Sequence, residues 1–241
     1  MFKNELLEIW NKRIEVVLIK DLKFNIVPFK VWLNETLLPL PPVWSGAHDA
    51  WNGGNSDPFS DSPTIPIDKS GSLGFGGWSV LGPTDKYTSG WYPNGILNSY
   101  DRVAPADFTS ANIKTDVCTG PMLSFVQTLE QKGIFLSRAR VTITKPNQGI
   151  QWHNDSNYPG ELIVRIQFPI ISNQKHFFHS ETQRWRLVDD GQVYMLNTNH
   201  QHKTVNDGHF IRFNLIADVD VSRLPNEDIY EILSGEEFNE K

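Results

Sequence analysis

The sequence predicts a mainly β protein whose second half is an antiparallel β sandwich or barrel. From Arg138 onward, short runs alternate apolar and polar residues, as strands with one buried face do. Turn-forming clusters of Asp, Asn, Gly and Pro separate these runs. A clear helical pattern over residues 120–132 precedes the first run. Together these observations predict a β-rich unit with flanking helices.

Length and composition agree with an ordinary folded protein. Of its 241 residues, 39% are hydrophobic and 21% charged, a composition typical of a folded chain. A chain of this length buries a core that is large enough to be stable without disulfides. A single cysteine, Cys118, excludes a disulfide framework and a thiolate zinc cluster. The net charge of −6 argues against a nucleic-acid partner. No apolar run is long enough for a membrane span or secretory signal, so we expect a cytoplasmic protein.

The first half of the chain has a weaker pattern. Residues 1–40 show helix-like spacing from Leu6 to Val17, whereas the stretch from Lys12 to Leu22 fits a strand equally well. Residues 39–110 are rich in Gly, Pro, Ser, Asn and Asp, which predicts long loops and short strands. This segment carries four tryptophans, Trp44, Trp51, Trp78 and Trp91. They either pin the loops to the core or line a substrate pocket.

The second half is predicted as one helix followed by strands. Residues 120–132 carry an apolar stripe at helical spacing, with Pro121 in the first turn and Gly133 after the last. Strands are expected at 140–144, 162–170, 176–179, 192–196 and 209–219. A short helix is expected around residues 227–233, in the acidic tail.

The sharpest local motif is His153-Asn154-Asp155. On extended backbone, residues i and i+2 point to the same side, so His153 and Asp155 can hold one edge of a metal ion. A further histidine would complete a two-histidine, one-carboxylate face, which leaves positions of an octahedral Fe(II) open. Taken alone, the triplet is more often a polar turn.

A lone arginine stands in the last apolar run of the β-rich half. Arg212 follows His202 by ten residues and lies within residues 210–219. A buried guanidinium without an anionic partner is costly. Its partner is either a small dicarboxylate co-substrate or an internal acid such as Asp218 or Glu181.

These motifs belong to a longer series with regular spacing. In order, it consists of Thr142-Ile143-Thr144-Lys145-Pro146, His153, Arg165-Ile166-Gln167, Glu181-Thr182 with Trp185, Gly191, His202, Arg212 and Asp218. With these motifs, residues 138–219 resemble the aspartyl/asparaginyl β-hydroxylase family of Fe(II)- and 2-oxoglutarate-dependent oxygenases. That family includes bacterial hydroxylases of free proline.

The resemblance implies a fold and a set of roles. The fold is a double-stranded β-helix (jelly-roll or cupin-like) with flanking helices and long Trp/Gly-rich loops. A single domain, 1–241, would then comprise a flanking and substrate-loop region (1–137), a catalytic core (138–219) and an acidic tail (220–241). By this resemblance, His153, Asp155 and His202 would ligate Fe(II). Arg212 would bind the distal carboxylate of 2-oxoglutarate, with Thr142 nearby. Arg165 and Gln167 would contact the metal-bound end of the co-substrate or the substrate.

The other histidines compete weakly for the third ligand position. His202 fits the spacings to both Gly191 and Arg212, which His200 and His209 do not, while His176 and His179 are expected at the surface or a pocket rim. Animal members of the family lack the carboxylate ligand, so Asp155 makes this chain more similar to the bacterial members.

The implied activity is hydroxylation, with dioxygen, of an amino-acid-type substrate, either peptidyl or free, coupled to decarboxylation of 2-oxoglutarate to succinate. Two alternatives stay open: a non-catalytic binding module of cupin or lectin type, and a metal-dependent hydrolase or isomerase on a similar barrel.

Overall fold

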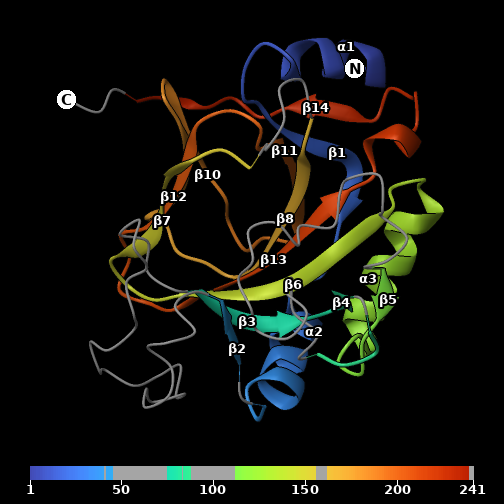
Figure 1. The fold of residues 1–241 in the computed structure, drawn as a ribbon, viewed down its shortest axis with the longest axis vertical. Helices are drawn as coiled ribbons and strands as arrows, with labels where there is room; N and C mark the ends of the chain where they lie inside the picture. Colours follow the sequence, from blue (N-terminus) through green and yellow to red (C-terminus); the bar gives the residue numbers. More distant parts are fainter. Residues whose placement is uncertain (41, 46–74, 83, 88–111, 156–161, 239–241) are drawn as a thin grey trace.

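A computed structural model describes residues 1–40, 42–45, 75–82, 84–87, 112–155 and 162–238. Most of the Trp-rich segment 39–110, including Trp51 and Trp91, lies outside the described residues. Within them, strands dominate and form two main antiparallel sheets, one of eight strands and one of five (Figure 1). The prediction of a mainly β fold is therefore confirmed. No described helix is long and apolar enough to cross a membrane.

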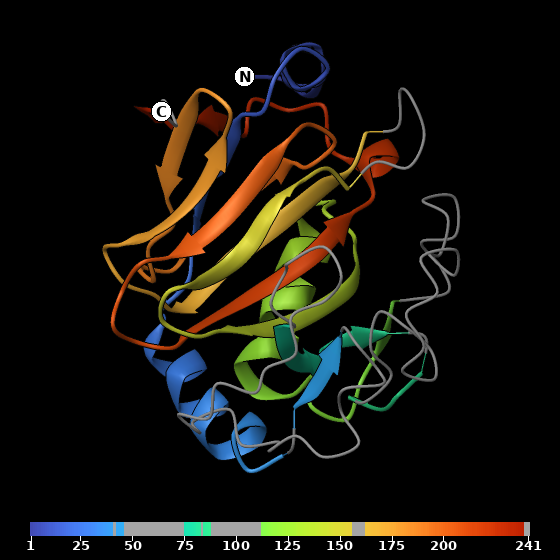
Figure 2. The same ribbon diagram turned by 60° about the vertical axis from the view of Figure 1, so that its left-hand side comes forward.

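Eight consecutive strands build the centre of the fold. They are β6 (Leu136–Thr144), β7 (Gln148–His153), β8 (Val164–Ile171), β9 (His176–Ser180), β10 (Gln183–Arg186), β11 (Gln192–Asn197), β12 (His202–Asn206) and β13 (Arg212–Val219). The larger sheet contains the order β11-β8-β13-β6, and the smaller sheet contains β10-β9-β12-β7. All of these pairings are antiparallel. Eight strands distributed in this way over two facing sheets form the expected double-stranded β-helix (Figure 2).

The N-terminal and C-terminal segments extend the larger sheet at both edges. On one side β1 (Val16–Lys23) pairs with β11 and with β14 (Tyr230–Ile232), and α1 (Lys3–Trp10) precedes it. On the other side β3 (Phe75–Ser79) pairs with β6 and with β2 (Val43–Ser45). Smaller elements are β4 (Leu81–Gly82) with β5 (Ile113–Lys114), β15 (Glu236–Glu237) on β10, and a 3-10 turn (Val221–Arg223). The early helix-or-strand segment thus contains both.

Two helical segments cover the outer face of the larger sheet. They are α2 (Val27–Trp32), continued by a π-helical turn (Leu33–Leu37), and α3 (Gly120–Gln131), the helix that the sequence predicted. Phenylalanine rings join them to the sheet: the ring centroid of Phe125 on α3 lies 4.8 Å from that of Phe168 on β8, and Phe29 on α2 lies 4.9 Å from Phe168. Figure 1 shows both helices on this side of the fold.

The space between the two sheets is divided into an apolar part and a polar part. Towards β1 and β11, Tyr194 and Leu196 pack with Phe178 and Trp185 of the smaller sheet. Towards β6 and β13, the buried residues are polar, namely Arg140, Thr142, Gln167, Arg212, Asn214 and Asp218. Buried polar groups are costly unless they bind each other or a ligand, so this part of the interior has the composition of a binding site.

Two local features depend on long-range contacts. The expected helix at residues 227–233 is wrong, because Tyr230 is buried and pairs with Ile19 in the edge strand β14. Gly191, in the turn before β11, has φ +89°, and a Cβ there would collide with the carbonyl oxygen of Phe24. That turn therefore requires glycine.

Candidate metal centre and its buried surroundings

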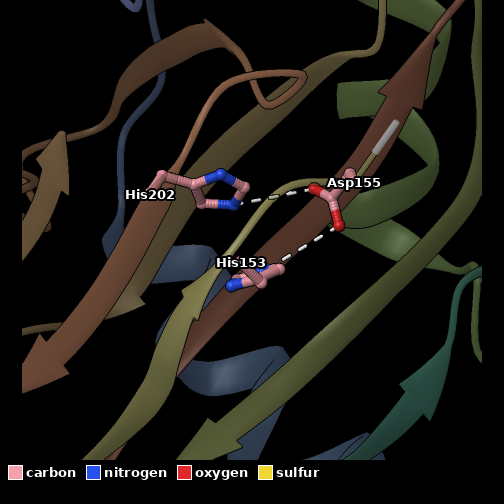
Figure 3. A group of neighbouring side chains, drawn as sticks. All are labelled: His153, Asp155 and His202. Atoms are coloured by element: carbon pink, nitrogen blue, oxygen red, sulfur yellow. Dashed lines mark ion pairs between the residues drawn. The ribbon is translucent and has the colours of Figure 1, made fainter. Parts of the chain in front are cut away.

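Three potential metal ligands converge at one end of the smaller sheet. His153 is the last residue of β7, and its cross-strand partner is His202, the first residue of β12. Asp155 follows β7 by two residues. One ligand atom from each side chain can be chosen so that all three lie within 4.8 Å of one another (Figure 3). Strand pairing brings the two histidines together, and the extended His153-Asn154-Asp155 segment adds the carboxylate.

The ligand atoms face each other. His153 Nε2 lies 3.7 Å from Asp155 Oδ1, and His202 Nε2 lies 3.6 Å from Asp155 Oδ2. His202 Nδ1 donates to the carbonyl oxygen of His200 at 2.9 Å, which leaves the Nε2 lone pair for a metal. The backbone N–H of Asp155 donates to the carbonyl oxygen of Thr198 at 2.8 Å. This bond ties the segment after β7 to the segment before β12.

The environment holds two of the ligands in the protonation states that a metal needs. Burial alone would raise the pKa of Asp155, but the nearby charge of Arg165, with His202 and His153, lowers it below its ordinary value. Burial lowers the pKa of His202 to about 4. At neutral pH the carboxylate is therefore ionised and the His202 imidazole is neutral, as metal ligation requires.

Arg165 lies directly behind the carboxylate. Its Nη1 is 2.7 Å from Asp155 Oδ2, and its Nε donates to Asp218 Oδ1 at 3.0 Å. Asp218, the cross-strand partner of Arg165, also forms an ion pair with Arg138. Two arginines and two aspartates thus form one continuous network that ends at the carboxylate of Asp155, in the candidate metal centre.

Arg212 has a different environment from Arg165. It is the first residue of β13 and only 2% exposed, and its Nη2 donates to Gln167 Oε1 at 3.1 Å. Within the described part of the chain, no carboxylate forms an ion pair with Arg212. Asp218 is engaged by the other two arginines, and Glu181 is exposed. Burial lowers the pKa of Arg212 to about 9, which still leaves it charged at neutral pH. The site therefore contains a buried cation whose counter-charge is absent from the described chain.

The remaining predicted site residues lie on strands beside Arg212. The Thr142 hydroxyl, on β6, donates to the carbonyl oxygen of Asn214 at 3.0 Å, and Gln167 lies on β8. The side chain of Asn206 links β12 to the end of β6 and to the segment before β13, because its Nδ2 donates to the carbonyl oxygens of Thr144 and Phe210, both at 3.0 Å.

The four other histidines that the structure describes occupy different environments. His200 bonds through Nε2 to the carbonyl oxygen of Trp10, 3.1 Å away, and His209 is exposed. The expectation that His176 and His179 lie at the surface or a rim is wrong, since they are 0% and 5% exposed. His179 is covered on the outer face of its sheet by Phe238, with ring centroids 4.5 Å apart.

The buried His176 gives a pH-dependent stability that can be measured. Burial, together with the positive charge of Arg212, lowers its pKa well below the ordinary value, with a smaller opposing effect from the backbone of Leu187. As pH falls through about 6.5, the unfolded chain takes up a proton at this ring and the folded chain does not. Stability is therefore lost on acidification, by up to about 1.4 kcal/mol per pH unit for this one group.

Urea unfolding at pH 7.5, 6.5 and 5.5 measures this effect. We expect His176→Phe to lose less stability than the wild type across this range, while the control His209→Gln, at an exposed position, follows the wild type. Parallel pH profiles for the wild type and His176→Phe would contradict the assignment.

Comparison of the sequence with known protein families gives a match to one family model. The sequence model of the family described as Aspartyl/Asparaginyl beta-hydroxylase matches residues 103–221, just under half of the chain. No curated protein matches the chain.

Two solved structures resemble the fold at low similarity. An oxidoreductase of the 2OG-Fe(II) oxygenase family from Burkholderia pseudomallei is 11% identical, with a TM-score of 0.38, over 84% of this chain and 94% of that one. A prolyl-4-hydroxylase from Pseudomonas putida is 11% identical, with a TM-score of 0.32, over 44% of this chain and 66% of that one. Likenesses at this level carry no argument about function.

A double-stranded β-helix that gathers two histidines and an aspartate at one end of its smaller sheet has the architecture of a metal-dependent oxygenase. Over residues 103–221 the chain matches the sequence model of the aspartyl/asparaginyl β-hydroxylase family, the family that the sequence resemblance indicated. This match supports an oxygenase of the hydroxylase type and opposes the alternative of a non-catalytic binding module.

Proposed function

We propose that the chain is an Fe(II)- and 2-oxoglutarate-dependent dioxygenase that hydroxylates an amino-acid-type substrate. One observation carries the proposal: a two-histidine, one-carboxylate cluster shares the barrel interior with a buried arginine that has no acidic partner among the described residues. The cluster suits a metal, and the arginine suits a dicarboxylate.

The donor set fits Fe(II). Two imidazoles and one carboxylate on one face leave positions open for other ligands, which is the pattern of non-haem iron oxygenases. His153, Asp155 and His202 would hold the ion, and Arg165 would hold Asp155 from behind. Bound there, Fe(II) would supply the activation of dioxygen. The overall reaction is substrate C–H plus dioxygen plus 2-oxoglutarate, giving substrate C–OH plus succinate plus carbon dioxide.

The buried polar side chains of β6, β8 and β13 would bind the co-substrate. Arg212 would pair with its distal carboxylate through charge-assisted hydrogen bonds, which are strong where water is excluded. Thr142 and Gln167 would help to place the bound molecule, and Arg165 lies on the metal side of the same interior. The catalytic core would be residues 138–219, flanked by 1–137 and 220–241.

The family supports an amino-acid-type primary substrate, either an aspartyl or asparaginyl side chain in a peptide or a free amino acid such as proline. The test is succinate release by purified protein with Fe(II), ascorbate and 2-oxoglutarate, screened over free amino acids and short peptides. We expect slow release without a primary substrate and faster release with the correct one. If no condition exceeds an iron-free control, the proposal fails.

A further inference from the structure

His176 lies inside the barrel, although the sequence predicts it at the surface or a pocket rim. On β9 it shares a face with Phe178 and Ser180, because alternate residues of a strand point the same way. That face is the interior one: the ring of Phe178 lies 5.3 Å from that of His202, and Ser180 is the cross-strand partner of His202. His176 therefore faces the space between the sheets.

His176 and Arg212 lie at the same end of that space. The cross-strand partner of His176 is Asn206, at the opposite end of β12 from His202. The side chain of Asn206 bonds to the carbonyl oxygen of Thr144, and Thr144 is the cross-strand partner of Arg212. The positive charge of Arg212 also contributes to the lowered pKa of the His176 imidazole. The metal ligands and this pair are thus at opposite ends of one buried space.

Both side chains retain unused hydrogen-bonding capacity. His176 is 0% exposed, and neither of its ring nitrogens has a hydrogen-bond partner of acceptable distance and angle. The backbone of Leu187 lies near the ring but affects its pKa less than burial and Arg212 do. Arg212 is 2% exposed, and its Nε has no hydrogen-bond partner. Burying such a group without a partner is unfavourable, and an apolar residue would fill the same volume without that cost. Two unsatisfied donors at one place point to a shared acceptor.

We propose that His176 donates a hydrogen bond to the distal carboxylate of 2-oxoglutarate, alongside Arg212. A neutral imidazole can donate one N–H beside a guanidinium without charge repulsion, and a carboxylate has enough oxygen lone pairs to accept from both. This inference rests on the proposed function and adds to it a specificity-determining residue. Its role is to select 2-oxo acids that carry a second carboxylate.

The experiment compares two ligands on the Mn(II)-loaded protein without oxygen, by calorimetric titration. 2-Oxoglutarate has the distal carboxylate, and 2-oxobutyrate offers the same metal-binding end without it. The quantity measured is the ratio of their dissociation constants. His176→Phe keeps a flat ring but removes the N–H, His176→Gln keeps a donor, and His179→Phe changes the outward-facing histidine of the same strand. Circular dichroism and thermal unfolding confirm that each variant is folded.

For His176→Phe we expect the preference for 2-oxoglutarate to fall about tenfold or more, because hydrogen bonds to charged groups contribute about 1.5–3 kcal/mol. Affinity for 2-oxobutyrate should change little, His176→Gln should restore part of the preference, and His179→Phe should match the wild type. An unchanged preference in His176→Phe overturns the inference and leaves the proposed function intact. If the wild type binds neither 2-oxo acid, the proposed function itself fails.

Discussion

Replacing Arg212 with glutamine is expected to raise the apparent KM for 2-oxoglutarate by at least about thirtyfold, since losing one partner of a buried charge pair costs about 2–5 kcal/mol. Without co-substrate, the same change should leave the free energy of unfolding unchanged or raise it. The reason is that the folded protein buries this guanidinium against the amide of Gln167 without an acidic partner in the described chain.

Opposite movements of affinity and stability distinguish a ligand-binding arginine from a structural one. Urea unfolding and succinate-release kinetics measure the two quantities on the same preparations. Arg186→Gln, on the exposed part of β10, serves as the control and should change neither. A KM shift below threefold, or a marked loss of stability in the ligand-free Arg212→Gln protein, would remove Arg212 from the co-substrate site.

Replacing Asp155 with alanine is expected to weaken Fe(II) or Mn(II) binding by at least about a hundredfold and to reduce turnover below detection. The carboxylate contributes the only negative charge of the proposed ligand set, and even residues behind a ligand change metal affinity by about 10–100-fold. The fold should persist, because Arg165 keeps its second partner, Asp218. Calorimetric titration with Mn(II) and the metal content of the purified protein measure the effect.

The matched control for this change is His200→Ala. His200 lies two residues from His202, but its ring is directed to the carbonyl oxygen of Trp10. It should bind metal as the wild type does. Retained metal binding and turnover in the Asp155→Ala protein would show that the two histidines suffice here.

The strands that the sequence revealed are those with apolar faces. β8, β11 and the later part of β13 carry alternating or continuous apolar residues and were predicted within a few positions. β7, β10 and β12 were not predicted, because their sequences, QGIQWH, QRWR and HKTVN, are largely polar. β7 ends and β12 begins with a histidine of the candidate metal centre, and neither strand shows the apolar periodicity by which strands are recognised.

The sequence indicates candidate ligands for the site but not the contacts between them. Spacing and family resemblance selected His153, Asp155 and His202, and the fold brings their ligand atoms together. The partnership of Arg165 with both aspartates depends on strand register, which no local pattern encodes. The burial of His176 depends on the opposite sheet in the same way.

Hydrogen bonds to the carbonyl oxygen of Trp10 connect the end of α1 to the segment between β11 and β12. Asn197 and His200 both bond to it, 2.9 and 3.1 Å away, and β1 completes the sheet beside β11. Family similarity begins only at residue 103. A fragment excised there would lose the anchor of the segment leading to His202 and expose an unpaired sheet edge, so we expect the region matched by the family model not to fold by itself.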